Sequence, residues 1–306
     1  MVDSNTSACL PGFVGQLPNL DGNFEIVEVE PGEGSKSIEV SAGLWSVLLE
    51  YGADRNSLII NVGGGVVLDL GGFVASTFKR GIPFINVPTS LLAMVDASLG
   101  GKTGINHEGI KNQVGTFTSA ELVLIDDAFL STLPEEEWRS GHGEMIKHSL
   151  LSGQNWPQVL KLTHQTLNDV HLKQSVDTKL AIVQSDFKEN GLRKVLNLGH
   201  TFGHAWESWC AQHSPISHGS AVIQGLHVAL YLSEQHDALK ALGQSYPWIK
   251  VDADALDDLW TLMQADKKNA KGQVRFVLLE NIGNPTFNCP ISRDQFYAAV
   301  QQLNSF

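Results

Sequence analysis

Short apolar segments alternate with amphipathic segments over the first 130 residues, and no other feature of the chain constrains its fold as strongly. The pattern predicts a helix over Ser41–Tyr51, with Leu44, Val47 and Leu48 on one face. The predicted strands are Phe24–Val29, Leu58–Val62, Phe84–Val87 and Leu122–Ile125. Apolar strands separated by helices are typical of a parallel sheet covered by helices. We therefore expect a Rossmann-like α/β parallel-sheet domain over residues 1–130.

Longer helical periodicities dominate the rest of the chain. The segments with this pattern are 134–152, 168–187, 193–212, 217–240, 254–265 and 293–304. One short apolar run, Val274–Leu279, is typical of a strand. The pattern predicts a mainly α-helical second domain over residues 131–306.

The beginning of the chain departs from this plan. Residues 1–20 are rich in polar and turn-forming residues, whereas a parallel α/β domain should begin with a strand. We therefore expect an N-terminally shortened first domain that begins just after a missing strand. A missing internal strand would leave an exposed sheet edge.

The composition excludes several kinds of partner. A formal net charge of −12 argues against nucleic acid and against membrane surfaces, because both reward basic patches. No apolar run is long enough to span a membrane, and the N-terminus lacks the regions of a signal peptide. Cys9, Cys210 and Cys289 lie far apart without a CxxC motif, as expected for a protein of the reducing cytoplasm.

A run of three glycines follows the second predicted strand. Gly63, Gly64 and Gly65 precede a helix that we expect to begin near Leu70. Glycines at such a turn allow a pyrophosphate to approach the backbone at a helix N-terminus. A tight strand-to-helix turn without a ligand explains the motif equally well.

A second glycine-rich segment runs from Asp96 to Asn112 and contains Lys102 and Lys111. We interpret it as a loop that the strand-like run Val87–Leu92 directs toward the C-terminal edge of the sheet. Ligands of open α/β folds bind at that edge, and lysines there suit phosphate or carboxylate groups. A solvated surface loop is the plain alternative.

The segment Arg193–His204 has the densest polar pattern. On one continuous helix, Arg193, Asn197, His200 and His204 would share a face. With His218 and one carboxylate, the histidines match the ligand preferences of a divalent metal such as zinc. Glu144 and Lys147 are three residues apart, and their own spacing favours a surface ion pair.

Taken in order, these segments carry a resemblance to the 3-dehydroquinate synthase family over essentially the whole chain. The motifs are GGGVVLDLGGFVAST, FKRGIPFINVPTSLLAMVDASLGGKTGIN, IKNQVGTF, TLPEEEW, GEMIKH, GLRKVLNLGHTFGHA, ISHGSAV and MQADKKN. The resemblance implies a catalytic NAD, a zinc ion with cobalt as an alternative, and a homodimer.

The resemblance also implies roles for individual residues. The expected metal ligands are Glu144, His200 and His218, which moves His204 from the ligand set toward the substrate. The expected NAD-binding residues are Asp3, Asn5, Glu33, Lys36, Gly64, Gly65, Val66, Asp69, Thr89, Ser90, Lys102, Lys111 and Thr132. The expected catalytic residues are Lys102, Lys147, Arg193, Asn197 and His204, and the expected substrate-binding residues are Arg80, Asp96, Lys111, Asn112, Lys179 and Lys268.

The implied substrate is 3-deoxy-D-arabino-heptulosonate 7-phosphate, an acidic sugar phosphate. The resemblance implies oxidation of its C5 alcohol by NAD, loss of phosphate, reduction of the ketone, ring opening and an intramolecular aldol closure. The zinc ion would lower the pKa of the substrate hydroxyls that it binds. Lysines and arginine would neutralise the carboxylate and phosphate.

Four positions depart from the family pattern, and three alternative interpretations stay open. Glu136 stands where the family has arginine, His142-Gly143 replaces an apolar residue and alanine, and Ser220 replaces glutamate. The alternatives are another sugar-phosphate cyclase, a metal-dependent polyol dehydrogenase and a truncated inactive chain. Asn197, Lys179 and Lys268 keep the dehydroquinate type, which disfavours another cyclase.

Overall fold

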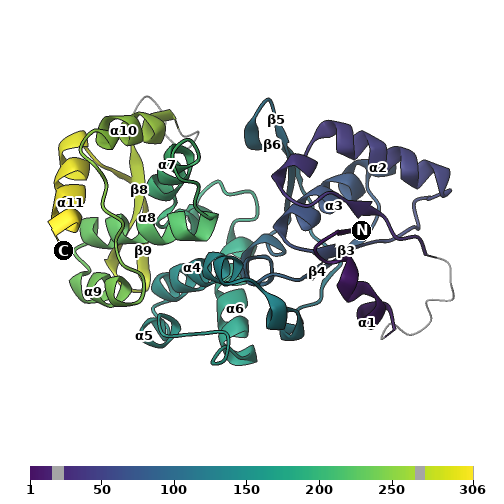
Figure 1. Ribbon diagram of the computed structural model, residues 1–306, viewed down its shortest axis with the longest axis horizontal. Helices are drawn as coiled ribbons and strands as arrows, with labels where there is room; N and C mark the ends of the chain where they lie inside the picture. The colour runs from purple at the N-terminus through teal and green to yellow at the C-terminus, as the bar shows by residue number, and fades with distance from the viewer. Residues whose placement is uncertain (16–23, 266–272, 306) are drawn as a thin grey trace. The chain divides into compact units, whose positions relative to one another are not determined.

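The computed structural model describes residues 1–15, 24–265 and 273–305. The chain divides into two compact units, Met1–Leu133 and Pro134–Phe306. The first unit combines a parallel sheet with helices and the second is mainly helical, as Figure 1 shows by its labels. The predicted fold class is confirmed. Among the described residues, no helix is both long and apolar enough to cross a membrane.

In its described residues, the first unit is built from short strands and three α-helices. Its strands are β1 (Val2–Asp3), β2 (Glu28–Val29), β3 (Ile59–Gly63), β4 (Phe84–Pro88), β5 (Lys102–His107), β6 (Ile110–Phe117) and β7 (Leu122–Val123). Its helices are α1 (Leu10–Val14), α2 (Ile38–Glu50) and α3 (Gly65–Thr77). Short 3-10 turns lie at Ser7–Cys9, Glu33–Ser35, Phe78–Arg80 and Asp127–Thr132, and a π-helical turn at Ala93–Ala97.

The sheet of this unit is parallel, in the order β3-β4-β7, with Val62 opposite Val87. Strand β1 pairs with β2, and the amide of Val62 donates to the Met1 carbonyl over 2.9 Å, which places β1 beside β3. The described part of residues 1–20 holds β1 and α1 beside its polar and turn-forming residues. The apolar side chain of Val2 is 1% exposed, so this short strand contributes to the core.

Helix α3 lies directly on this sheet and on strand β5 because two of its residues have no side chain. A Cβ on Gly71 would lie 1.9 Å from Asn61 Oδ1, and one on Gly72 would lie 2.6 Å from the Thr103 side chain. The helix begins at Gly65, with Gly64 as its N-cap, rather than near Leu70 as expected. The three glycines therefore end strand β3 (Gly63), cap the helix (Gly64) and begin it (Gly65).

The segment Asp96–Asn112 is not a loop, contrary to the prediction. Its second half forms an antiparallel hairpin of β5 and β6, in which Thr103 pairs with Thr116 and Ile105 with Val114. Buried Ile105 on one face gives the hairpin an apolar anchor that the surrounding glycines conceal in the sequence. The strand-like run also ends early, because β4 stops at Pro88 and Leu91 is already helical.

The second unit is a group of helices with one hairpin. The helices are α4 (Glu135–Ser152), α5 (Trp156–Val159), α6 (Asp169–Ser185), α7 (His200–Cys210), α8 (His218–Leu232), α9 (His236–Ser245), α10 (Ala255–Ala265) and α11 (Arg293–Ser305). The hairpin consists of β8 (Arg275–Asn281) and β9 (Asn284–Pro290), and a 3-10 turn covers Leu192–Asn197. The sequence pattern missed α5 and β9, and it merged α8 with α9.

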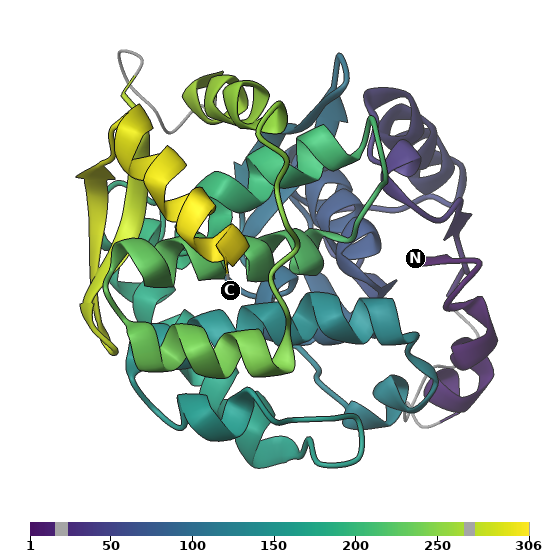
Figure 2. The ribbon, with the colours of Figure 1, turned by 60° about the vertical axis from the view of Figure 1, so that its left-hand side comes forward.

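Helix α8 is the centre of this unit. Gly219 and every residue from Ala221 to Leu230 are buried, because α4, α7, α9, α11 and β8 pack around the helix (Figure 2). Glycines permit close approach of its neighbours: a Cβ on Gly219 would lie 2.1 Å from the Ser140 Cα of α4. The close packing brings the polar residues of α4, α7 and α8 within reach of one another.

Candidate functional site

Three histidines converge at the contact of α7 and α8. His200 and His204 lie on α7, and His218 is the first residue of α8. Each offers a ring nitrogen, and these atoms all lie within 4.8 Å of one another. The ring centroids of His200 and His218 are 5.6 Å apart. This grouping is compact enough to share one cation.

Glu144 and Lys147 bring charge to the same place from α4. Their exposed fractions are 1% and 2%, so the prediction of a surface ion pair is wrong. The Lys147 ammonium donates to Glu144 Oε2, and the other oxygen, Oε1, lies 3.4 Å from His200 Nε2. A carboxylate is buried at such a site only when a partner or a ligand compensates its desolvation.

The hydrogen bond from His200 Nδ1 determines which atom of this ring can bind a metal ion together with Glu144. His200 Nδ1 lies 3.1 Å from the Leu198 carbonyl, which can only accept, so Nδ1 carries the proton. In a neutral ring, Nε2 then presents a lone pair to Glu144 Oε1, which is buried and has no hydrogen-bond partner among the described residues. Two lone pairs that face each other require a proton or a cation between them. The donor set of carboxylate and imidazole is the one that zinc prefers.

His218 is held in the same tautomer by Glu207, which was not among the expected site residues. Its Nδ1 lies 2.9 Å from Glu207 Oε2, so this nitrogen donates and Nε2 keeps its lone pair. A signal for Glu207 was present in the sequence. It lies three residues after His204 and seven after His200, and such spacing places all three on one face of a helix.

The segment Arg193–His204 is not one helix, contrary to the prediction. Leu192–Asn197 forms a 3-10 turn, and α7 begins only at His200 after Gly199, whose φ is 80°. A side chain at position 199 would also meet Leu226 of α8 at 3.0 Å. Arg193 and Asn197 therefore reach their positions through a bend and not through helical spacing.

The bend is organised by acidic residues that the sequence reasoning missed. Asp186 accepts hydrogen bonds from the backbone N–H groups of Asn190, Gly191 and Arg193, over 2.9, 2.7 and 3.1 Å. These bonds lower the pKa of Asp186, the one from Gly191 most of all. Glu189 accepts from Asn197 Nδ2 over 2.9 Å.

Two further cationic residues of the expected site are buried in this unit. The Arg193 side chain is 2% exposed and donates from Nη1 to the Phe187 carbonyl. Lys179, on α6, is 5% exposed. Lys268, the remaining expected substrate residue of this part, lies outside the described residues. Buried cations in one unit are a suitable environment for an anionic substrate.

In the first unit, the glycine turn and the end of β4 lie together. The Thr89 amide donates to the Gly63 carbonyl over 3.1 Å, and a Cβ on Gly64 would lie 3.7 Å from Ser90 Oγ. Gly64 and Gly65 therefore present backbone at the N-terminus of α3. This arrangement is suited to a pyrophosphate, because the helix end carries amide donors and partial positive charge.

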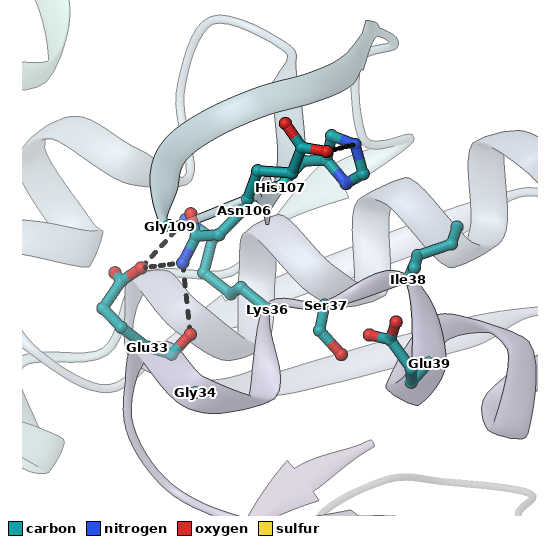
Figure 3. A pocket seen from close by; sticks show the side chains of 10 residues that line it. Glu33, Gly34, Lys36, Ser37, Ile38, Glu39, Asn106, His107 and Gly109 are labelled. Carbon is teal, nitrogen blue, oxygen red and sulfur yellow. Dashed lines mark hydrogen bonds and ion pairs between the residues drawn. The ribbon is translucent and has the colours of Figure 1, made fainter.

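Lys36 connects several of the residues expected around the nucleotide and the substrate. Its ammonium lies 2.7 Å from Asp69 Oδ2 and 2.6 Å from Asn112 Oδ1, and the side chain is 3% exposed. Asn106 donates to Glu33 Oε2 over 2.9 Å (Figure 3). Glu33, Lys36 and Asn106 help to line a pocket of about 260 Å³. Its lining residues are Glu33, Gly34, Lys36, Ser37, Ile38, Glu39, Asn106, His107, Glu108 and Gly109.

The other expected residues of the first unit are spread over its elements. Lys102 begins β5 and Lys111 lies on β6, both with exposed side chains. Asp3 ends β1, and its carboxylate accepts from the Thr6 amide over 3.0 Å. The remaining positions are Asn5 after β1, Val66 in α3, Arg80 and Thr132 at the ends of 3-10 turns, and Asp96 in the π-helical turn.

Comparison with known proteins gives consistent matches along the chain. Residues 26–140 match the family described as 3-dehydroquinate synthase N-terminal, and residues 141–269 match 3-dehydroquinate synthase C-terminal. The 3-dehydroquinate synthase of Parabacteroides distasonis is 41% identical, over 98% of this chain and 89% of its own. That of Leptospira interrogans serovar copenhageni is 43% identical, over 91% of this chain and 81% of its own.

Two solved structures share the fold at lower identity. One is 2-deoxy-scyllo-inosose synthase complexed with carbaglucose-6-phosphate, NAD+ and Co2+, with a TM-score of 0.82 and 22% identity over 98% of this chain and 89% of that chain. The other is ValA, a 2-epi-5-epi-valiolone synthase from Streptomyces hygroscopicus with NAD+ and Zn2+ bound. It has a TM-score of 0.81 and 23% identity, over 99% of this chain and 89% of that chain.

Proposed function

This chain belongs to the 3-dehydroquinate synthase family, and we propose that it converts 3-deoxy-D-arabino-heptulosonate 7-phosphate into 3-dehydroquinate and phosphate. This makes it a carbon–oxygen lyase of the shikimate pathway, with NAD and a divalent metal as cofactors. The observation that carries the proposal is the buried Glu144 carboxylate, whose Oε1 lies 3.4 Å from His200 Nε2. A catalytically inactive chain that only folds or binds a ligand would not need this buried pair.

We assign Glu144, His200 and His218 as the residues that hold the metal. Zinc or cobalt bound there acts as a Lewis acid on the substrate hydroxyls and lowers their pKa. The Lys147 ammonium, buried beside Glu144, fixes the orientation of this carboxylate by pairing with its second oxygen. His204, whose ring centroid lies 5.2 Å from that of His200, is assigned to the substrate.

The nucleotide is assigned to residues 1–130, where Gly64 and Gly65 would hold its pyrophosphate. Bound NAD would supply the hydride chemistry and would be regenerated within each turnover. The other residues assigned to it are Asp3, Asn5, Glu33, Lys36, Val66, Asp69, Thr89, Ser90, Lys102, Lys111 and Thr132. The ion pair of Lys36 with Asp69 fixes one edge of this site.

Cations and amides within each unit are assigned to the substrate. In residues 131–306, Arg193 and Lys179 are buried cations suited to carboxylate and phosphate groups, and Asn197 is held by Glu189. The substrate residues assigned in the first unit are Arg80, Asp96, Lys102, Lys111 and Asn112. Lys268 completes the assignment from the sequence. We further propose a cytoplasmic homodimer, which the three unpaired cysteines support for the compartment.

The decisive experiment measures two products at once. The purified chain, supplied with NAD and zinc, is expected to release phosphate from the heptulosonate without net accumulation of NADH. A chelator should abolish the release, and added zinc or cobalt should restore it. Net NADH formation would point to a polyol dehydrogenase. No release from this substrate, with release from another sugar phosphate, would point to a different cyclase.

A further inference from the structure

The two imidazoles at the candidate metal centre are anchored by different acceptors. His200 donates from Nδ1 to the neutral carbonyl of Leu198, over 3.1 Å. His218 donates from Nδ1 to the carboxylate of Glu207, over 2.9 Å. The Glu207 side chain is 19% exposed and the His218 side chain 33%, so this ion pair is partly shielded from water. Glu207 itself is not part of the proposed ligand set.

The position of His218 makes a carboxylate partner significant. His218 is the first residue of α8, where the end of the helix carries partial positive charge. Such a field disfavours a second positive charge and weakens the imidazole as a ligand. Because Glu207 places a negative charge next to the ring, it offsets this field at the nitrogen that it contacts.

We propose that Glu207 is a positioning residue for the metal centre. It holds His218 with Nδ1 protonated, which leaves the Nε2 lone pair available for the ion, and its charge raises the basicity of that nitrogen. His200, His204 and Glu207 share one face of α7, so a single helix supplies one ligand and the anchor of another. The inference rests on the proposed metal site and extends it by one residue.

The test measures metal affinity rather than turnover. Metal-free protein is titrated with zinc in competition with a chromophoric chelator, and with cobalt while its visible absorption is recorded. The variants are Glu207→Ala and Glu207→Gln, with His218→Ala as the ligand control. Asp257→Asn is the matched control, because Asp257 is an exposed carboxylate paired with Arg293 in the same unit.

Glu207→Ala should raise the zinc Kd by roughly 10- to 100-fold and alter the cobalt spectrum. Glu207→Gln keeps an oxygen that accepts the hydrogen bond from Nδ1–H but loses the charge. A smaller increase in the zinc Kd, of roughly three- to tenfold, is therefore expected. Asp257→Asn should leave the Kd unchanged. If the alanine variant does not fold, the zinc Kd of the nearly isosteric glutamine variant tests the role of Glu207.

Unchanged affinity in both folded Glu207 variants, with binding lost in His218→Ala, would overturn this inference and leave the metal site intact. Unchanged affinity in the glutamine variant would overturn it equally if the alanine variant does not fold. Zinc binding that does not respond to His218→Ala would instead overturn the proposed ligand set, and the role of Glu207 with it.

Discussion

At the scale of single residues, the second unit buries an unusual number of ionisable side chains. Glu144, Lys147, Lys179 and Arg193 are each at most 5% exposed. Buried charges destabilise a fold unless partners or ligands compensate them, so they are retained where function requires them. Their orientation depends on neighbours that bind no ligand themselves, and Asp186 is the clearest example.

Replacing Asp186 with alanine should impair catalysis while leaving the fold intact. The carboxylate accepts three backbone N–H groups of the bend that carries Arg193 and Asn197. Without it the bend loosens, and we expect kcat/KM for phosphate release to fall roughly tenfold or more. Asp186→Asn keeps one acceptor oxygen and should lose less. Equal kcat/KM values for alanine variant and wild type would contradict this role.

At the scale of elements, the α7–α8 contact depends on glycine. A Cβ on Gly225 would lie 1.7 Å from the Gly199 carbonyl oxygen, and one on Gly203 would lie 3.0 Å from the Ala221 oxygen. The backbones therefore touch. Because His200 and His218 lie on these two helices, the distance between them is set by this contact.

Gly225→Ala should destabilise the protein by about 3 kcal/mol, since the neighbouring backbone must move to admit the methyl group. It should also weaken zinc binding. The matched control is Gly243→Ala in α9, where the nearest atom to a new Cβ is His227 Cε1 at 3.9 Å. There alanine should stabilise by about 0.5–1 kcal/mol. Thermal unfolding of both variants measures the difference, and equal stabilities would refute the packing argument.

The start of α8 has an incomplete capping pattern. Ser217 is the N-cap, and its hydroxyl accepts from the Ser220 amide over 3.4 Å. In the family pattern, glutamate stands at position 220, where its carboxylate would accept a hydrogen bond from the N-cap N–H. Ser220→Glu is therefore expected to stabilise the chain by about 0.5–1 kcal/mol. A lowered Tm, measured with chelator present, would contradict this expectation.

At the scale of the whole molecule, stability should depend on the protonation of a buried histidine. Burial lowers the pKa of His227 from 6.5 to about 4. Between these values the unfolded chain binds a proton that the folded chain excludes, so stability rises with pH across this window. The contribution is complete above pH 6.5 and is lost as the pH falls toward 4. It is worth about 3 kcal/mol at most.

Unfolding by denaturant at several pH values between 4 and 7 measures this slope. His227→Gln retains an N–H donor for the Tyr246 carbonyl, which His227 Nε2 contacts at 2.8 Å, but has no proton to gain. The variant should therefore lose this part of the pH dependence. An unchanged slope in the variant would assign the acid sensitivity to other groups.

Much of this architecture was accessible from the sequence. The strands at Leu58–Val62 and Phe84–Val87 and the helices over 134–152 and 168–187 were predicted to within a few residues. Long periodic patterns are reliable because each records the burial of one continuous face. The hairpin β5–β6 was missed, because its glycines mask the alternation and its pairing is tertiary.

By itself, the sequence determined the α/β-then-helical order, the family, and the residue types that the chemistry needs. Only the tertiary structure decided that Glu144 and Lys147 are buried, that the chain bends at Gly199, and that Glu207 anchors His218. The physical reason is that periodicity records which face of a helix is apolar, but not which helix lies opposite. A polar pair becomes a site only when a neighbouring helix excludes water from it, and here glycine contacts bring α4, α7 and α8 close enough to do so.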